Sequence, residues 1–363
     1  MSRIRVLVVD DSPIMRKLIT QALSADREIQ VVGTASNGKE ALEKAPRLRP
    51  DVITLDIEMP VMDGLTALES LRRVYPKARV IMFSSLTEKG AKETIKALSL
   101  GAFDFVTKPS TRSLTESIKK IREELIPKIK SAAPRAPAVA RRPAVAPRPA
   151  PTPRPSAPTR RVSTLSLPGR FEVVAIGVST GGPKALGEII PKLPGNFPAP
   201  ILIVQHMPPI FTTQLAERLD QLSALKVVEA QEGMPLAPGK VFIAPGDYHM
   251  EVRDRGPARV VHLHKGPPEN SCRPAVDVLF RSVAKVFGRK SVGIVLTGMG
   301  QDGLAGAKIM KEKGALIVAQ DEATCVVYGM PRAIVEAGLA DYVLPLPEIP
   351  NFLQKLFLKR IAV

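Results

Sequence analysis

Short apolar runs alternate with longer amphipathic stretches along the first third of the chain. The apolar runs are IRVLVVD, QVVGTAS, DVITLD, RVIMFSS and FDFVTKP. The stretches between and after them are SPIMRKLITQALS, NGKEALEKAPRLR, DGLTALESLRRVY, EKGAKETIKALSLG and TESIKKIREELIPKIK. In the first stretch, an apolar stripe recurs at helical spacing through Ile14, Met15, Leu18, Ile19, Ala22 and Leu23. Five such alternations predict a (βα)5 domain, a doubly wound parallel sheet with helices on both faces.

The second half of the chain follows the same pattern with longer connections. Its continuous apolar runs are FEVVAIGV, PAPILIVQ, KVFIAP, SVGIVLTG and GALIVAQ, and RVVHLHK looks like an additional strand. Helical patterns occupy PKALGEII, PPIFTTQLAERLDQL, AVDVLFRSVAKVF and GLAGAKIMKEK. We therefore expect a second doubly wound α/β domain.

A segment rich in Pro, Ala and Arg separates the two halves. Between Ser131 and Arg170 it contains eight arginines and no acidic residue, and so it carries 8 of the net +17 charges. Its prolines fix φ and lack a backbone donor, and it has too few large apolar residues to offset the entropy of ordering. The sequence thus predicts a first domain over residues 1–127, a semi-extended linker over 128–170 and a second domain over 171–363.

Composition narrows the functional classes. No apolar run is long enough to span a bilayer, and the N-terminus meets carboxylates too early for a signal peptide. We therefore expect a cytoplasmic protein that is not inserted in a membrane. Because the linker carries so much of the positive charge, a specific nucleic-acid surface is not expected. Cys272 and Cys325 lack any CxxC or CxxH spacing, so we expect no zinc site and two reduced, buried thiols.

Polar residues end four of the apolar runs in the first domain. They are Asp10 and Asp11 after the first run, Asp56 after the third, Ser84 after the fourth and Lys108 after the fifth. The carboxyl ends of parallel strands meet at one edge of a sheet, so these side chains should converge there. Clustered carboxylates repel one another and need a cation, and all-oxygen ligands suit Mg²⁺. A phosphoryl group on Asp56 would then lie between Mg²⁺ and Lys108, with Ser84 as a hydroxyl donor.

The motifs VVDDSP, LDIEMPVMDG, FSS and TKP resemble the receiver domain of two-component response regulators. The resemblance covers residues 1–127 and implies phosphotransfer from a histidine kinase to Asp56. The implied Mg²⁺ ligands are Asp10, Asp11, Asp56 and the backbone carbonyl of Glu58. The implied switch residues are Ser84, Phe105 and Lys108, because Phe105 falls on the aromatic switch position of that family.

The stretch IGVSTGG closes an apolar run and opens a helical pattern. Such a turn either cradles a phosphate or presents a nucleophilic serine. The lysine of a phosphate-binding P-loop is missing here, and Ser179 stands where a dinucleotide fingerprint has glycine. Ser179 is therefore our candidate nucleophile, with a plain structural turn as the alternative. A serine nucleophile also needs a base and an acid that orients the base.

Four histidines compete for the role of the base. His206 directly follows PAPILIVQ, which places it at the same edge of the sheet as Ser179. His249 also follows a strand and is the main competitor, although it lies further out in its loop. His262 and His264 alternate within a strand and share one face, which favours packing over catalysis.

The acid and the oxyanion donors are sought at the same edge. Asp302 lies in the loop MGQDG after SVGIVLTG, among glycines that let a backbone approach a ligand closely. Asp247 and Asp321, each at a strand end, are the runners-up. Backbone N–H groups in such loops bind oxyanions, and we name those of Met299 and Thr180. The predicted catalytic residues are thus Ser179, His206 and Asp302.

Long motifs of the second domain resemble the catalytic domain of the chemotaxis response-regulator protein-glutamate methylesterases. They are IGVSTGGPKAL, IVQHMPPIFT, VFIAPGDYHM, RPAVDVLFRSVA, VGIVLTGMGQDG and CVVYGMP. The catalytic serine, histidine and aspartate of that family fall on Ser179, His206 and Asp302. Their order along the chain differs from the Ser–Asp–His order of the α/β-hydrolases, so membership of that fold is not implied.

This resemblance implies a serine esterase that hydrolyses glutamate γ-methyl esters on methyl-accepting chemotaxis receptors and deamidates particular glutamines there, without a cofactor for the esterase. It also implies a chemotaxis histidine kinase as phosphodonor and a receiver that covers the catalytic cleft until Asp56 is phosphorylated. An alternative is a response regulator whose C-terminal domain is a non-catalytic adaptor or a weak nucleic-acid binder.

Overall fold

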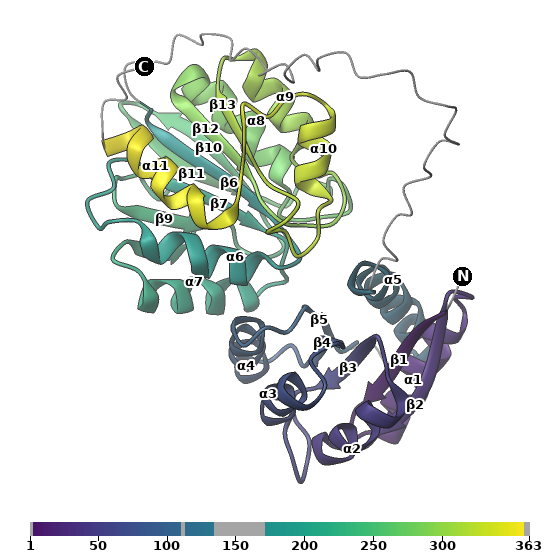
Figure 1. Cartoon of the computed structure of the whole chain (residues 1–363). Helices are drawn as coiled ribbons and strands as arrows, with labels where there is room; N and C mark the ends of the chain where they lie inside the picture. Colours follow the sequence, from purple (N-terminus) through teal and green to yellow (C-terminus); the bar gives the residue numbers. More distant parts are fainter. Residues whose placement is uncertain (1–2, 110–112, 134–170, 359–363) are drawn as a thin grey trace, which may run out of the picture.

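The computed structural model describes residues 3–109, 113–133 and 171–358, which form an N-terminal and a C-terminal α/β domain (Figure 1). In the N-terminal domain, parallel strands take the order β2-β1-β3-β4-β5. The strands are β1 Ile4–Val9, β2 Ile29–Ala35, β3 Val52–Asp56, β4 Arg79–Ser84 and β5 Asp104–Thr107. The helices are α1 Pro13–Ser24, α2 Gly38–Leu48, α3 Gly64–Val74, α4 Glu88–Ser99 and α5 Leu114–Ala132. The predicted (βα)5 architecture is confirmed.

The C-terminal domain is built on a second parallel sheet with the strand order β14-β13-β12-β6-β7-β9-β8. Its strands are β6 Val173–Val178, β7 Ile201–Gln205, β8 Lys226–Glu229, β9 Lys240–Ile243, β12 Ser291–Val295, β13 Leu316–Gln320 and β14 Tyr342–Leu344. A separate antiparallel hairpin joins β10 His249–Arg255 to β11 Ala258–His264. The helices are α6 Gly182–Ile189, α7 Phe211–Leu222, α8 Val276–Phe287, α9 Leu304–Glu312, α10 Met330–Glu336 and α11 Ile349–Leu358, with short 3-10 turns η1 Ile190–Lys192, η2 Gly288–Lys290 and η3 Leu346–Glu348. The predicted second doubly wound domain is also confirmed.

The first helix illustrates how local signals produce these elements. Ser12 caps α1 by accepting a hydrogen bond from the backbone N–H of Met15, and a proline follows the cap. Four residues of the predicted stripe are buried: Leu18, Ile19, Ala22 and Leu23. Ile14 does not belong to the core, because 67% of it is exposed. It lies in the first turn of the helix.

Helix α5 extends beyond residue 127, where the sequence pattern ends the first domain. It runs to Ala132, and both Ile129 and Ala132 are buried. The apolar face of the helix therefore continues for another turn after Pro127. Residues 134–170, which make up most of the predicted linker, lie outside the described residues.

Five elements of the C-terminal domain have no counterpart in the sequence prediction: β8, β10, β14, α10 and α11. Strands β8 and β14 are short and lie at the two edges of the sheet. Strand β10 belongs to the hairpin, whose outer end is exposed, and so its charged sequence HMEVRDR lacks a clear apolar pattern. The pattern RVVHLHK was correctly taken as a strand, and β10 is the partner that it pairs with.

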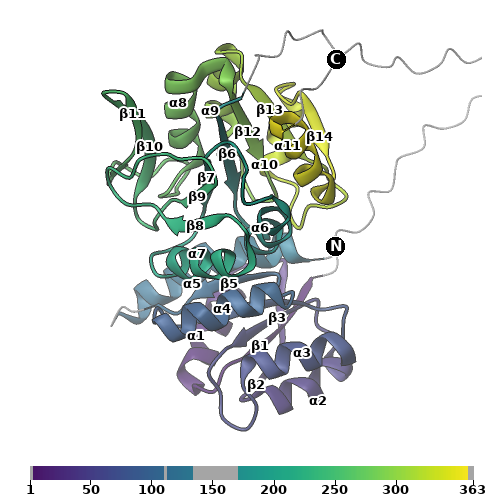
Figure 2. The same cartoon turned by 90° about the vertical axis from the view of Figure 1, so that its left-hand side faces the viewer.

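The two domains pack against each other through α4, which contacts α6 and α7 (Figure 2). The ring of Phe105 on β5 stacks on the ring of Phe211 on α7, with 4.6 Å between centroids and 16° between planes. A single cluster of buried apolar residues thereby continues from one domain into the other. The N-terminal domain lies against the helices that begin near the carboxyl edge of the second sheet.

Two helical glycines in the C-terminal domain should respond in opposite ways to alanine. A Cβ at Gly306 in α9 would lie 2.5 Å from the Cβ of Phe280 and 3.0 Å from the carbonyl oxygen of Asp277, so Gly306→Ala should cost about 1–3 kcal/mol. A Cβ at Gly187 in α6 would meet nothing within 4 Å, so Gly187→Ala should raise the free energy of unfolding by about 0.5–1 kcal/mol. Urea denaturation measures both, and equal shifts in one direction would contradict the packing described.

Candidate active site

The central strands of the second sheet bring the sequence-predicted residues to one edge. Strand β6 lies between β12 and β7, and all three run parallel. Ser179 follows β6, His206 follows β7, and Asp302 lies in the loop after β12. The chain order of the strands reverses on the two sides of β6, and such switch points are where open α/β sheets bind ligands.

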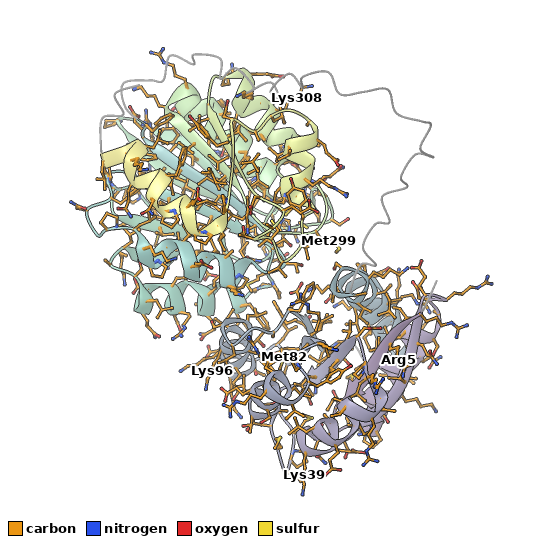
Figure 3. The ribbon with its side chains drawn as sticks, viewed as in Figure 1. Arg5, Lys39, Met82, Lys96, Met299 and Lys308 are labelled. Carbon is orange, nitrogen blue, oxygen red and sulfur yellow. The ribbon has the colours of Figure 1, made fainter. Side chains whose placement is uncertain are left out.

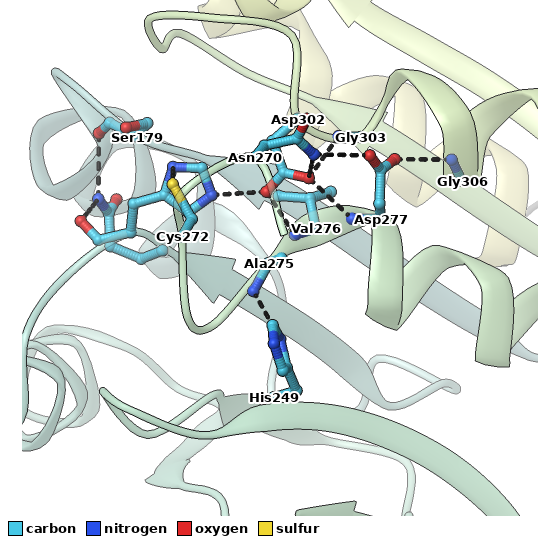
Figure 4. Close-up of polar contacts among 12 residues, drawn as sticks. Ser179, His249, Asn270, Cys272, Ala275, Val276, Asp277, Asp302, Gly303 and Gly306 are labelled. Atoms are coloured by element: carbon cyan, nitrogen blue, oxygen red, sulfur yellow. Dashed lines mark hydrogen bonds and ion pairs between the residues drawn. The ribbon is translucent and has the colours of Figure 1, made fainter. Parts of the chain in front are cut away.

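Gln205 ties the backbones of Ser179 and His206 together. Its Nε2 donates to the carbonyl oxygen of Ser179 at 3.1 Å and to that of His206 at 3.2 Å (Figure 4). Gln205 is buried, and a Cβ at Gly182 would lie 1.8 Å from its Oε1. Glycine at 182 therefore leaves room for this side chain. Sequence reasoning missed Gln205, although a glutamine at the end of an otherwise apolar strand was the available signal.

His206 and Asp302 form the best-defined contact of the site. The Nε2 of His206 lies 2.7 Å from the Oδ2 of Asp302. Asp302 is 2% exposed and also accepts hydrogen bonds from the N–H groups of Val276, Asp277 and Gly303 at 2.7, 3.1 and 2.9 Å. The first two of these amides begin helix α8, where the helix dipole favours negative charge. The carboxylate is thus held, ionised, in one orientation.

Ser179 is not yet joined to this pair. Among the described residues no hydrogen bond reaches its hydroxyl, and its side chain is half-buried. Because Nε2 of His206 is occupied by Asp302, Nδ1 is the ring nitrogen left for the serine. That Nδ1 lies 3.6 Å from the Sγ of Cys272. Contact between Ser179 and His206 therefore stays a prediction, whereas the contact between His206 and Asp302 is present.

The electrostatics of the pair favour a protonated imidazole. Burial alone would lower the pKa of His206, but the contacts with Asp302 and Cys272 together outweigh burial and raise the pKa to about 9. Burial alone would raise the pKa of Asp302, but His206 and the N–H groups of Val276 and Asp277 together lower it below the ordinary value. A general base must be neutral to accept a proton, so this arrangement holds the base back near neutral pH.

The competing histidines have other partners. His249 is 1% exposed; its Nδ1 accepts from the N–H of Ala275 at 3.2 Å, and its Nε2 donates to the carbonyl oxygen of Pro267 at 2.9 Å. His262 lies 3.1 Å from Glu232, and its ring stacks on that of His264 at 5.8 Å. All three stabilise the hairpin and the loop beside it.

The runner-up acids are also engaged elsewhere. Asp247 forms ion pairs with Arg273 and Lys265. Asp321 accepts hydrogen bonds from Thr324. The structure therefore unites His206 with Asp302 and with neither of the two alternatives.

The predicted oxyanion donors belong to two loops: Thr180 directly follows Ser179, and Met299 directly follows Gly298. Met299 is 39% exposed and lies at the side of the C-terminal domain that faces the N-terminal domain (Figure 3). Thr180 is buried. Within the described part of the chain, neither backbone N–H has a hydrogen-bond partner. Gly298 runs close to the serine, because a Cβ there would lie 2.8 Å from the Cβ of Ser179.

The carboxylates of the N-terminal domain converge as the sequence predicts. Lys108 Nζ lies 2.7 Å from Asp56 Oδ2 and 3.2 Å from Asp10 Oδ2. Carboxylate oxygens of Asp10, Asp11 and Asp56 lie within 4.8 Å of one another. Burial raises the pKa of Asp10, and burial also raises that of Asp56 to about 6 despite the pull of Lys108. Lys108 alone does not balance the charge of the three carboxylates, and this cluster of oxygen atoms fits a small divalent cation.

Of the three predicted switch residues, Lys108 belongs to this cluster, whereas Ser84 and Phe105 have partners elsewhere. The hydroxyl of Ser84 donates to the carbonyl oxygen of Gly90 at 3.1 Å and accepts from Thr94 at 2.8 Å, both on α4. Phe105 is buried against Phe211 of the other domain. The side chain of Glu58 pairs with Lys89 at 3.1 Å and is exposed, and the role of its backbone carbonyl as a ligand stays a prediction.

The N-terminal domain covers the candidate active site. Asp104 Oδ2 accepts a 2.7 Å hydrogen bond from the hydroxyl of Thr180, the residue next to Ser179. A cavity of about 490 Å³ is lined by His206 and Cys272 from one domain and by Phe105 and Lys128 from the other. Substrate access to His206 is therefore narrowed by β5 and α5.

Asn270, Asp277 and Cys272 surround the pair of His206 and Asp302, and the sequence did not predict them in these positions. Asn270 bonds to Asp302 and to Asp277, which is buried. No pattern in PENSC or in the helix RPAVDVLFRSVA distinguishes them. Cys272 was expected to be buried; both cysteines are free, as predicted, but each is only half-buried.

Within residues 3–109, 113–133 and 171–358, the chain forms no helix with the length and apolar character needed to cross a bilayer.

Comparison with known proteins finds two matching families. The CheB methylesterase family matches residues 174–353, and the response regulator receiver domain matches residues 6–119. A protein-glutamate methylesterase/protein-glutamine glutaminase of Nocardioides sp. is 49% identical over 362 residues, which cover 99% of this chain and 97% of that protein. One of the same name from Pyrococcus abyssi is 47% identical, over 96% of this chain and 92% of its own. The crystal structure of the Thermotoga maritima CheB methylesterase catalytic domain is 48% identical with a TM-score of 0.51, over 51% of this chain and 98% of that one.

We expect the stability of the folded chain to decrease as the pH rises from about 6.5 to 9. The pKa of His206 is raised to about 9 in the folded state. Its stabilisation is therefore complete below the ordinary pKa of about 6.5 and lost as the pH passes 9, a change on the order of 3 kcal/mol. Urea denaturation across this range should show the fall in wild type and not in His206→Gln. A wild-type free energy of unfolding that stays level would contradict the raised pKa.

Proposed function

Since the chain belongs to the CheB methylesterase family, we propose that it is a phosphorylation-activated protein-glutamate methylesterase and protein-glutamine glutaminase. Its substrates are glutamate γ-methyl esters, and specific glutamines, on chemotaxis receptors, and a chemotaxis histidine kinase is the phosphodonor. It acts in the cytoplasm. The observation that carries this proposal is the 2.7 Å contact between His206 and Asp302 at the sheet edge where Ser179 follows β6.

Ser179, His206 and Asp302 act as nucleophile, base and orienting acid. Nδ1 of His206 takes the proton of the Ser179 hydroxyl as Oγ attacks the ester carbonyl carbon. The same proton then passes to the leaving methoxy group, and methanol departs, which leaves an acyl-serine. Water attacks this ester with His206 again as base, and glutamate and free serine are restored. For glutamine the leaving group is ammonia, and the same atoms act.

The oxyanion formed in each step is stabilised by the backbone N–H groups of Met299 and Thr180. Support comes from their positions beside Ser179 and from the lack of another partner for either N–H within the described residues. Each such donor is worth roughly a 10²–10³-fold change in rate.

We further propose that phosphorylation of Asp56 releases the N-terminal domain from the active site. Strand β5 connects the two sites: Lys108, just past its end, pairs with Asp56, while Asp104 and Phe105 hold Thr180 and Phe211. A phosphoryl group on Asp56 competes for Lys108 and attracts the Ser84 hydroxyl away from α4. Either change loosens the contact between β5 and the catalytic edge. Nδ1 of His206 can then leave the Sγ of Cys272 and bond to the hydroxyl of Ser179.

Asp10, Asp11 and Asp56, with the backbone carbonyl of Glu58, would hold Mg²⁺ for this phosphorylation. Bound there, the ion supplies charge neutralisation for the incoming phosphoryl group. The carboxylate oxygens within 4.8 Å of one another and the raised pKa of Asp56 support this assignment. Family membership does not favour the alternative of a non-catalytic adaptor or a weak nucleic-acid binder.

Ser179→Ala should reduce methanol release from methylated receptor by at least about 10³-fold, because the acyl-serine can no longer form. The same variant should still incorporate phosphate at Asp56, since that site lies in the other domain. Release is measured by the methanol produced, with and without a small phosphodonor such as acetyl phosphate. Turnover at the wild-type rate in this variant rules out a serine mechanism, and no release by the wild type supports the adaptor alternative.

Asp56→Asn should abolish activation by the phosphodonor while leaving basal methanol release unchanged. Conversely, Asp104→Ala should raise basal release several-fold, because a hydrogen bond to a charged group that holds the covered state is lost. The exposed Asp254, in the distant hairpin, provides a matched control as Asp254→Ala. Activation of Asp56→Asn by the phosphodonor, or unchanged basal release in Asp104→Ala, argues against coupling through β5.

A further inference from the structure

A single amide joins two buried carboxylates behind His206. The Nδ2 of Asn270 donates to Asp302 Oδ1 at 3.0 Å and to Asp277 Oδ2 at 2.9 Å (Figure 4). Asp302 and Asp277 are 2% and 4% exposed, respectively. Asn270 therefore has both amide hydrogens engaged at carboxylates that are withdrawn from solvent.

The hydrogen bonds of Asp302 are divided between its two oxygens. Oδ2 receives His206 Nε2 and the N–H of Val276, both at 2.7 Å. Oδ1 receives Asn270 at 3.0 Å and two backbone N–H groups. Among the described residues, Asn270 and His206 are the side chains that bond to Asp302. The amide thus anchors the oxygen opposite the one that orients the base.

The charges around Asn270 require a neutral donor. Asp277 Oδ1 accepts from the N–H of Gly306 at 2.6 Å, and its other oxygen turns toward Asn270. Two buried carboxylates beside each other repel, and each needs a donor. An asparagine amide supplies two N–H donors without adding charge, whereas an aspartate supplies none when ionised.

The backbone holds Asn270 in place for this contact. Its φ is +51°, a left-handed conformation that asparagine tolerates better than most residues. Glu269 and Cys272 exchange backbone hydrogen bonds of 2.8 and 3.1 Å across it, and Glu269 pairs with Arg281 on α8 at 2.5 Å. The loop is therefore tied to the helix whose first amides also bind Asp302.

We propose that Asn270 is a positioning residue of the hydrolase: its amide fixes Asp302 in the orientation that aligns His206, and it separates the charges of Asp302 and Asp277. The proposal rests on the proposed esterase function. Because Asn270 acts through Asp302 and does not touch the reacting atoms, its loss should lower kcat and leave KM unchanged.

Two substitutions distinguish donation from a conformational role. Asn270→Gly keeps the left-handed backbone and removes the amide. Asn270→Asp keeps the side-chain shape and the tolerance of positive φ, but replaces the donor by a carboxylate. If Asn270 only shaped the loop, Asn270→Asp would be near wild type and the more flexible Asn270→Gly the worse variant. Donation predicts the reverse order.

The experiment measures kcat and KM for methanol release from methylated receptor, with acetyl phosphate present. We expect Asn270→Gly to lose roughly 10- to 100-fold in kcat with KM unchanged, and Asn270→Asp to lose more. Matched controls are Asn196→Gly and Asn196→Asp, at an exposed loop before β7 at the opposite edge of the sheet, which should keep wild-type kcat. Thermal unfolding and phosphorylation of Asp56 report on the fold of each variant.

The possible outcomes separate this inference from the proposed function. No methanol release by wild type overturns the proposed function. Wild-type release with Asn270→Asp retaining full kcat, or with losses confined to KM, overturns the positioning role alone. If Asn270→Gly does not fold, the kcat of Asn270→Asp still tests the positioning role, because aspartate keeps the shape of the asparagine side chain but changes its charge.

Discussion

In the function that we propose, the orientation of one imidazole, that of His206, governs the chemistry of the C-terminal domain. His206 faces Asp302 through Nε2, and Asp302 is itself held by the first amides of α8 and by Asn270. This carboxylate accepts hydrogen bonds from the buried N-terminus of a core helix and orients His206 at the same time. A change that frees the carboxylate would therefore disturb both the packing of α8 and the direction in which His206 points. Catalytic geometry and fold stability are linked at this residue.

In the function that we propose, the same contact helps to keep the covered state inactive. Bonded to Asp302, the imidazole has its pKa raised to about 9, and its free nitrogen lies beside Cys272 instead of Ser179. The N-terminal domain adds a second restraint through the hydroxyl of Thr180. His206 and Asp302 are thus already in contact, whereas the contact between His206 and Ser179 has not formed. We interpret β5 as the element that couples phosphorylation at the carboxylate cluster to the sheet edge that carries Ser179 and His206.

Much of the architecture follows from the sequence, because parallel sheets covered on both faces need long apolar strands and amphipathic helices. The positions of His206 and Asp302 could likewise be predicted, since His206 directly follows such a strand and Asp302 lies in the loop after another. Short edge strands and the hairpin strand β10 escaped prediction because their burial is one-sided or partial. Asn270, Asp277 and Gln205 also escaped, since their roles depend on which loops meet in space. Ile14 was expected in the apolar stripe but is exposed, because helical periodicity alone does not show which positions of a stripe the rest of the domain covers.

The most direct test of this account is the rate at which a fluorophosphonate labels the protein, followed by intact mass and peptide mapping. The account predicts one label, on Ser179, formed slowly by the unphosphorylated chain and faster once a small phosphodonor has modified Asp56. A label on another residue, no label at all, or a rate that ignores the phosphodonor would contradict it.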